Sequence, residues 1–300
     1  MKRRFSTLLL SALAVVAVGG LTVLRTNLVA DAAWRNTATL VTKNYPVSAG
    51  FTDISITEYY ADVELRASRD GTVSVTTRDA EDVTHTVTVK NGTLSISRPE
   101  PTVGERWFHD DDDDPKVVVY LPAGDYGALT VNTTSGDVES ASQLNFSAAS
   151  LTTVSGDIDL MGSVTGAVNC TSTSGDIELR SPALGAVKTN TTSGDTEITG
   201  ALIQSLKAET VSGDVDLERT TASGAIEINT TSGDVDMESV DAASLNILTT
   251  SGEVEGSLLS GKNFSASSTS GRVNVPASTP NAGACTVSTT SGSIRLTVRP

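Results

Sequence analysis

Carboxylates recur at a fixed spacing along the second half of the chain, and they are the residues that could do chemistry. The first row of acidic residues lies two positions after a repeated serine: Asp137, Asp157, Asp176, Asp195, Asp214, Asp234 and Glu253. The second row lies two positions further on: Glu139, Asp159, Glu178, Glu197, Asp216, Asp236 and Glu255. Calcium accepts carboxylate oxygens in flexible geometry, so both rows are candidate calcium ligands. No pattern in the sequence requires a cofactor.

Residues two apart on a strand share a face, so both rows are expected on the outside of one sheet. Neighbouring like charges then repel by about 1 kcal/mol per pair even in water. Three interpretations remain open. Calcium could bridge successive carboxylates, a cationic partner could dock on them, or they could form a solvated face that blocks lateral strand association.

A second acidic cluster, Asp110 to Asp114, directly follows Trp107, Phe108 and His109. Five carboxylates beside a histidine could hold a hard cation. The run lacks the alternating ligands and the distal glutamate of an EF-hand loop, and a block of like charges is typical of a solvated loop. The sequence therefore favours a loop without defined coordination geometry.

A repeat of 19 to 21 residues positions the two acidic rows. Ser-Gly pairs begin at Ser135, Ser155, Ser174, Ser193, Ser212, Ser232, Ser251, Ser270 and Ser291. Apolar residues alternate with polar ones on both sides of each pair, which predicts strand, corner and strand. One such unit cannot bury its apolar face alone, whereas stacked units can. We therefore predict an all-β fold, a β-solenoid of about nine coils over residues 129–300.

The repeated glycine predicts a corner that either needs a positive φ or has no room for a Cβ atom. The same stacking bears on the two cysteines, Cys170 in the third unit and Cys285 in the ninth. Six coils at about 4.8 Å each separate them by roughly 29 Å, which is beyond the reach of a disulfide. Each is expected to be a small buried residue.

Residues 37–128 are predicted to form an antiparallel β region that covers the first open edge of the stack. Alternating segments such as Val63–Leu65 and Val117–Leu121 indicate strands, and Asn91-Gly92 is typical of a two-residue hairpin turn. Residues 1–36 form a separate segment. There, Lys2 to Arg4 precede an uncharged run from Phe5 to Leu24, which is about long enough to span a membrane.

That N-terminal pattern predicts an exported protein. We expect residues 5–24 to anchor it in the cytoplasmic membrane, with the repeats outside the cytoplasm; secretion after cleavage near Ala33 is the alternative. The chain carries 36 acidic and 21 basic residues, a net charge of −15, so nucleic acid is excluded as a partner. The charge is uneven, because the four charged residues from position 261 onward are all basic. With their prolines they predict that the last coil caps the stack.

The tandem Thr-Thr-Ser-Gly-Asp units, the Asn-Gly-Thr-Leu hairpin and Leu121-Pro122 resemble the bacterial β-strand-repeat family of putative adhesins, a domain family of unknown function. The resemblance covers residues 37–300. It implies a secreted or membrane-anchored repeat domain without established catalytic residues.

We accordingly expect no enzymatic activity, but a rod whose acidic face serves adhesion or binding to an envelope protein, surface protein or cationic ligand. A structural or envelope-stress accessory that docks a membrane partner is the alternative. A carboxylate-dependent glycan enzyme is more remote, because such chemistry needs carboxylates in unlike environments and a cleft.

Overall fold

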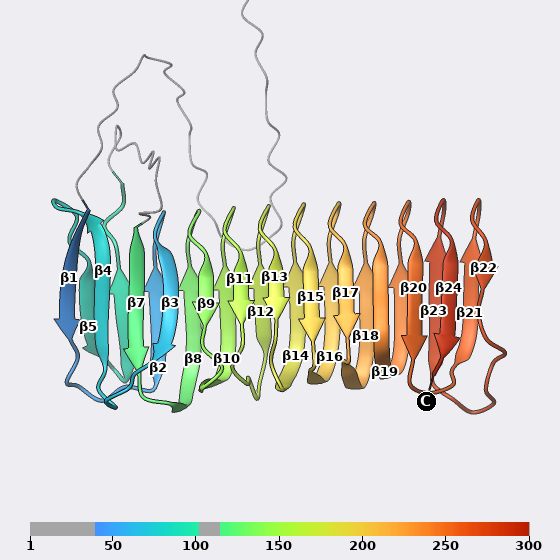
Figure 1. Ribbon diagram of the computed structural model, residues 1–300, viewed down its shortest axis with the longest axis horizontal. Helices are drawn as coiled ribbons and strands as arrows, with labels where there is room; N and C mark the ends of the chain where they lie inside the picture. Colours follow the sequence, from blue (N-terminus) through green and yellow to red (C-terminus); the bar gives the residue numbers. More distant parts are fainter. Residues whose placement is uncertain (1–39, 102–114, 300) are drawn as a thin grey trace, which may run out of the picture. The chain divides into compact units, whose positions relative to one another are not determined.

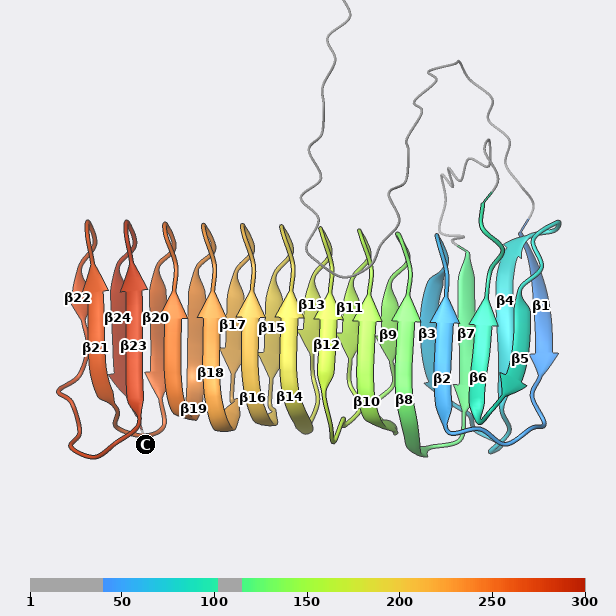
Figure 2. The ribbon, with the colours of Figure 1, turned by 180° about the vertical axis from the view of Figure 1, so that it is seen from behind.

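Each repeat folds into two short strands joined by its Ser-Gly corner, and successive repeats stack in parallel. The computed structural model describes residues 40–101 and 115–299, which belong to one compact unit, residues 36–300. These residues form 24 β-strands and no helix. Figures 1 and 2 show the strands as two layers, with the corners aligned along one edge. The predicted all-β solenoid is confirmed.

We call the two layers sheet A and sheet B. The strands of sheet A are β1 (Leu40–Pro46), β3 (Asp62–Ala67), β4 (Ser74–Ala80), β7 (Lys116–Leu121), β9 (Val138–Ser140), β11 (Ile158–Leu160), β13 (Ile177–Leu179), β15 (Thr196–Thr199), β17 (Val215–Glu218), β20 (Val254–Leu258), β22 (Val273–Asn274) and β24 (Ile294–Val298).

The strands of sheet B are β2 (Asp53–Thr57), β5 (Thr86–Lys90), β6 (Thr93–Ser97), β8 (Gly124–Asn132), β10 (Leu144–Thr152), β12 (Val168–Thr171), β14 (Ala183–Asn190), β16 (Leu202–Glu209), β18 (Thr221–Asn229), β21 (Asn263–Ser268) and β23 (Ala284–Thr289). Strand β19 (Val235–Leu248) begins in sheet A and ends in sheet B. All nine predicted units are present.

The region before the repeats is only partly antiparallel. Strand β4 pairs antiparallel with β1 and β7, and β5 pairs antiparallel with β6 across the Asn91-Gly92 turn, whose φ angles are 51° and 78°. That hairpin is as predicted. Strands β2 and β3, however, pair in parallel with β6 and β7 on one side and with β8 and β9 on the other. This region therefore adds two coils to the stack as well as covering its first edge.

The coils do not stack in strict chain order at either end. Coil β2/β3 lies between β6/β7 and β8/β9, although both follow it in the sequence. Coil β23/β24 lies between β19/β20 and β21/β22. The prediction that the ninth unit caps the stack is therefore wrong. The eighth unit, which has fewer apolar residues facing inward, occupies the end.

The space between the sheets is filled by small aliphatic side chains in one hydrophobic cluster that runs from Ile54 to Leu296. The parts before and after residue 129 share this core, so a domain boundary there stays a prediction. Cys170 and Cys285 are both fully buried and unpaired, as expected. Burial raises the pKa of the Cys170 thiol to about 12, so this thiol is chemically inert at neutral pH.

Two predictions fall outside the described residues: the membrane anchor at residues 5–24 and the acidic run Asp110 to Asp114 with His109. Within residues 40–101 and 115–299, no helix has the length and apolar character needed to cross a membrane.

Candidate functional site: the acidic face of sheet A

The corner glycines bring successive coils unusually close together. A Cβ atom on Gly194 would lie 2.1 Å from the carbonyl oxygen of Gly175 in the preceding coil, and the same contact recurs at the other repeat corners. The corner glycines are not among the glycines with positive φ. Of the two predicted reasons for glycine, lack of space is therefore confirmed and a positive φ is wrong.

Threonine and aspartate satisfy the backbone at each corner. The glycine N–H donates to a hydroxyl three residues earlier, on Thr133, Thr153, Ser172, Thr191, Thr210, Thr230, Thr249, Ser268 and Thr289, at 2.8–3.3 Å. The backbone N–H of each first-row residue donates to Oδ1 of the aspartate in the coil before it, as from Asp195 to Asp176 at 2.7 Å. The same bond links all seven first-row residues, at 2.7–3.1 Å. The first row is thus part of the backbone's hydrogen-bond network.

The second row forms an unbroken line of carboxylates across sheet A, as predicted. Each member lies directly beside the next in the strand register, as Glu197 lies beside Asp216. The same pairing holds for the whole row. Unlike the first row, these carboxylates accept no backbone N–H from the next coil among the described hydrogen bonds.

Cations neutralise parts of the second row. Arg180 Nη2 lies 2.6 Å from Asp159 Oδ2 and also pairs with Glu178. Arg295 Nη1 lies 2.6 Å from Glu255 Oε1. Between them, Glu197, Asp216 and Asp236 have no lysine or arginine within ion-pair distance among the described residues. The unneutralised charge is concentrated over strands β15, β17 and β19.

Burial and the crowding of carboxylates together change the protonation of Asp216. Partial burial, followed by repulsion from Asp236, Asp214 and other neighbouring carboxylates, raises its pKa to about 6. Burial and repulsion from Glu255 also raise the pKa of Asp236. Because the pKa of folded Asp216 exceeds its ordinary value of 3.8, ionised Asp216 destabilises the fold at pH 7. This loss of folding stability disappears as Asp216 takes up a proton, between about pH 6 and pH 4.

A groove of about 620 Å³ lies along this segment of the second row. Six carboxylates line it, those of Glu197, Asp216, Glu218, Asp236, Glu238 and Glu255. Arg295 and Arg299 line its β24 end. The groove crosses the strands, so carboxylates of the second row recur along it about every 4.8 Å. Such a surface suits a linear ligand with several positive charges.

The proposed calcium role of both rows stays a prediction. In the described part of the chain, no group of three or more histidine, cysteine, aspartate or glutamate side chains is arranged to hold a metal ion. Since the first-row Oδ1 atoms already accept backbone N–H groups, the second row offers the freer oxygens. Calcium titration of the folded protein can check this.

The structure adds Asp62 and Glu64 of β3, which the sequence interpretation missed, to the two rows. Asp62 Oδ1 accepts the N–H of Asp137 at 3.1 Å, and Glu64 lies beside Glu139 in the strand register. Lys116 Nζ lies 2.9 Å from Glu64 Oε1. The sequence Ala61-Asp62-Val63-Glu64 could have indicated this extra coil, because it matches a repeat corner with alanine in place of glycine.

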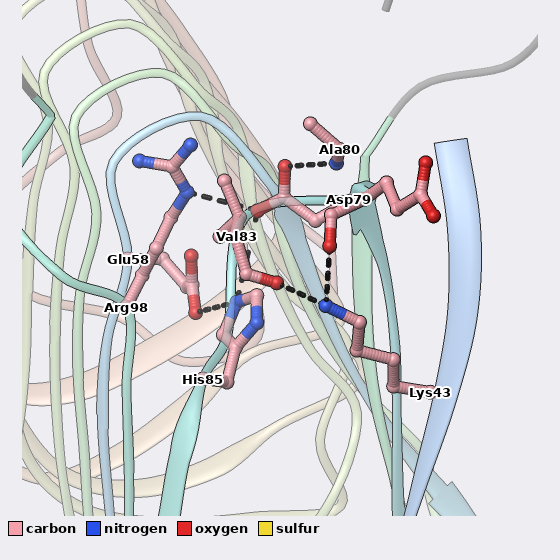
Figure 3. Close-up of polar contacts among 8 residues, drawn as sticks. Lys43, Glu58, Asp79, Ala80, Val83, His85 and Arg98 are labelled. Atoms are coloured by element: carbon pink, nitrogen blue, oxygen red, sulfur yellow. Dashed lines mark hydrogen bonds and ion pairs between the residues drawn. The ribbon is translucent and has the colours of Figure 1, made fainter. Parts of the chain in front are cut away.

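A buried charged cluster at the N-terminal end of the stack was also missed (Figure 3). His85 Nε2 lies 3.0 Å from Glu58 Oε1 and 3.9 Å from Asp79 Oδ2, and Arg98 Nε lies 2.8 Å from the same Asp79 oxygen. Glu58 and His85 side chains are fully buried. Asp79 lies on β4, while Glu58, His85 and Arg98 flank β2, β5 and β6.

This cluster joins the antiparallel cap to the first parallel coils. Lys43 of β1 adds two bonds from Nζ, to the carbonyl oxygens of Glu81 (2.9 Å) and Val83 (2.6 Å) in the turn between β4 and β5. Burial is the main cause that raises the pKa of Glu58. The cluster is closed to solvent, so its evident role is to hold the cap in register.

The family comparison agrees with this architecture. The sequence model described as Toastrack DUF4097 matches residues 51–258 and 227–300. Among solved structures, a putative adhesin from Bacteroides fragilis is 18% identical with a TM-score of 0.41, over 86% of this chain and 97% of that one.

Two structures from Parabacteroides distasonis are also similar to the chain. A putative lipid binding protein is 17% identical with a TM-score of 0.47, and a putative adhesin is 14% identical with a TM-score of 0.48. Each match covers 87% of this chain and 98% of the other. No curated protein matches significantly. The family match spans most of the sequence, including every repeat, and the chain therefore belongs to the Toastrack DUF4097 family.

Proposed function

We propose that the protein is a non-enzymatic binding rod outside the cytoplasmic membrane, and that the groove on sheet A binds a cationic partner. The observation that carries this proposal is the unneutralised stretch of the second row at Glu197, Asp216 and Asp236. Mutual repulsion there costs stability, and a partner that supplies positive charges would remove the cost. The partner would be an envelope protein, a surface protein or another cationic ligand.

The N-terminal sequence supports the location in this proposal. Three basic residues precede an uncharged run of 20 residues, Phe5 to Leu24, a pattern that directs a chain across or into the cytoplasmic membrane. If the run is retained, it tethers the rod to the membrane surface, and the acidic face becomes available to partners in the envelope.

The pKa pattern favours binding over carboxylate catalysis. Glycoside hydrolysis needs two carboxylates whose environments push their pKa values apart, so that one donates a proton while the other stays ionised. The pKa values of Asp216 and of its neighbour Asp236 are both raised. Burial is the main cause in both cases and repulsion between carboxylates the second, so the two side chains share one kind of environment and are not suited to divided roles.

A labelled decalysine peptide tests the proposal by fluorescence anisotropy with the full-length protein at low salt. We expect Asp216→Asn/Asp236→Asn to weaken binding about tenfold, equivalent to about 1.4 kcal/mol, and added salt to weaken wild-type binding. The matched control is Glu81→Gln/Asp82→Asn, which removes two exposed charges from the turn between β4 and β5. If both double variants weaken binding equally, net charge rather than the groove attracts the peptide, and the proposal fails.

A further inference from the structure

The C-terminal coil occupies a slot between two other coils. Strand β23 pairs with β19 on one side and β21 on the other, while β24 pairs with β20 and β22. Figures 1 and 2 show both strands enclosed in this way. The outer coil β21/β22 therefore lies two coil spacings from β19/β20, and residues 284–298 fill the gap between them, which is one coil high.

Apolar packing explains why this coil lies inside. Cys285, Val287, Ile294 and Leu296 are all at most 2% exposed in the slot. In the outer coil, Val273 is 42% exposed. The coil with the more continuous apolar face thus occupies the position that is covered on both sides.

The outer coil is tied to the stack by a contact that bypasses the C-terminal coil. Lys262 precedes β21, and its Nζ donates to Asp241 Oδ1 (2.5 Å), the carbonyl oxygen of Ala242 (2.7 Å) and Ser260 Oγ (2.9 Å). Its side chain is only 5% exposed, so all three donors are satisfied away from solvent. Residues 284–298 contribute nothing to this anchor, which fixes one side of the slot independently of its occupant.

One connecting segment determines whether the slot is filled by the coil of the same molecule or by that of a second molecule. Residues 275–283 join β22 to β23 without forming a strand, and nine residues can extend roughly 30 Å. Every ladder and apolar contact of the coil could be made equally by the same coil of a second molecule. An exchange of identical elements between two copies is a low-cost route to a dimer.

The outer end of the stack adds a reason for exchange. Within the described residues, β21 and β22 pair with other strands on one side only, and the Ser278 hydroxyl bonds to the backbone of Phe264 on the outer edge of β21. No strand covers this end of the described stack, so it stays available for pairing with a second copy. We propose that two copies of this chain exchange residues 284–298 reciprocally, each coil filling the other's slot. The exchange joins two rods at their C-terminal ends and brings the two open edges together.

A disulfide between chains tests the exchange directly. Leu245 of β19 lies opposite Cys285 of β23, and adjacent parallel strands hold such Cα atoms about 4.8 Å apart, within disulfide range. One tagged full-length chain carries Leu245→Cys, Cys285→Ser and Cys170→Ser; the other, differently tagged, carries only Cys170→Ser. After mixing at high protein concentration and mild oxidation, we expect a covalent heterodimer on a non-reducing gel, increasing with protein concentration.

The control is a single chain with Leu245→Cys and Cys170→Ser, which should close an internal disulfide. If it closes while the mixture gives no heterodimer, the exchange is refuted. If it does not close, the slot arrangement itself is contradicted.

Discussion

Replacing Gly194 with valine is expected to lower the free energy of unfolding by about 3 kcal/mol or more. The added Cβ would lie 2.1 Å from the oxygen and 2.5 Å from the carbon of the Gly175 carbonyl group. Both are backbone atoms held by the ladders of adjacent coils, so neither can move without breaking hydrogen bonds. Overpacking a core usually costs 1–3 kcal/mol, and a rigid backbone contact belongs at the upper end. Chemical denaturation measures the change.

Thr192→Val is the matched control, because the repeat itself places Val154 and Val211 at the equivalent corner position, where they are 46% and 47% exposed. This change should stay within about 0.5 kcal/mol. Gly194→Ala should already be strongly destabilising, since the clash involves the Cβ atom itself. An alanine variant as stable as the wild type would show that the coils are further apart than described.

Replacing Glu58 with alanine is expected to cost about 3 kcal/mol or more. The change leaves a cavity and removes the carboxylate that lies 3.0 Å from the fully buried His85. Leaving a buried polar group without its partner typically costs about 1–3 kcal/mol, and the cavity left by the side chain adds to that. The cap strands β1, β4 and β5 should lose protection from hydrogen exchange first, because the cluster joins them to the stack.

Glu81→Gln controls for the loss of an acidic group in the same cap, and it should have little effect because Glu81 is exposed. Glu58→Gln adds a pH test. Since burial raises the pKa of Glu58, the wild-type carboxyl takes up a proton as the pH falls and comes to resemble glutamine. The stability difference between this variant and the wild type should therefore shrink in acid. A difference that grows in acid would contradict the account.

The repeat architecture could be predicted because its determinants are local. Each unit of about 19 residues repeats the strand alternation, the corner glycine and the acidic positions. The structure of one unit therefore predicts that of the next. The role of the first row could not be predicted from the sequence. Its pattern indicates that Asp176 is a surface charge, but Asp176 Oδ1 accepts the N–H of Asp195 in the next coil. This bond can be recognised only once the coil spacing is known.

The ends of the stack depend on contacts between distant residues, and there the sequence interpretation failed. Nothing near Cys285 indicates that its strand pairs with β19 rather than with β21 alone; the choice depends on which coil buries more apolar surface. The coil β2/β3 was not predicted, because its corner has Ala61 in place of the repeat glycine. Glu58 and His85 meet across strands that are far apart in sequence, so no motif marks their contact.

The central claim is that the unneutralised part of the second row is a binding surface, and the pKa of Asp216 tests it most directly. Carboxyl-detected NMR of the full-length protein can follow this one side chain with and without saturating decalysine. The account predicts a pKa of about 6 for the free protein and a fall towards 3.8 in the complex, because bound cations stabilise the ionised form. If the peptide binds and the pKa of Asp216 does not change, the groove is not the binding site.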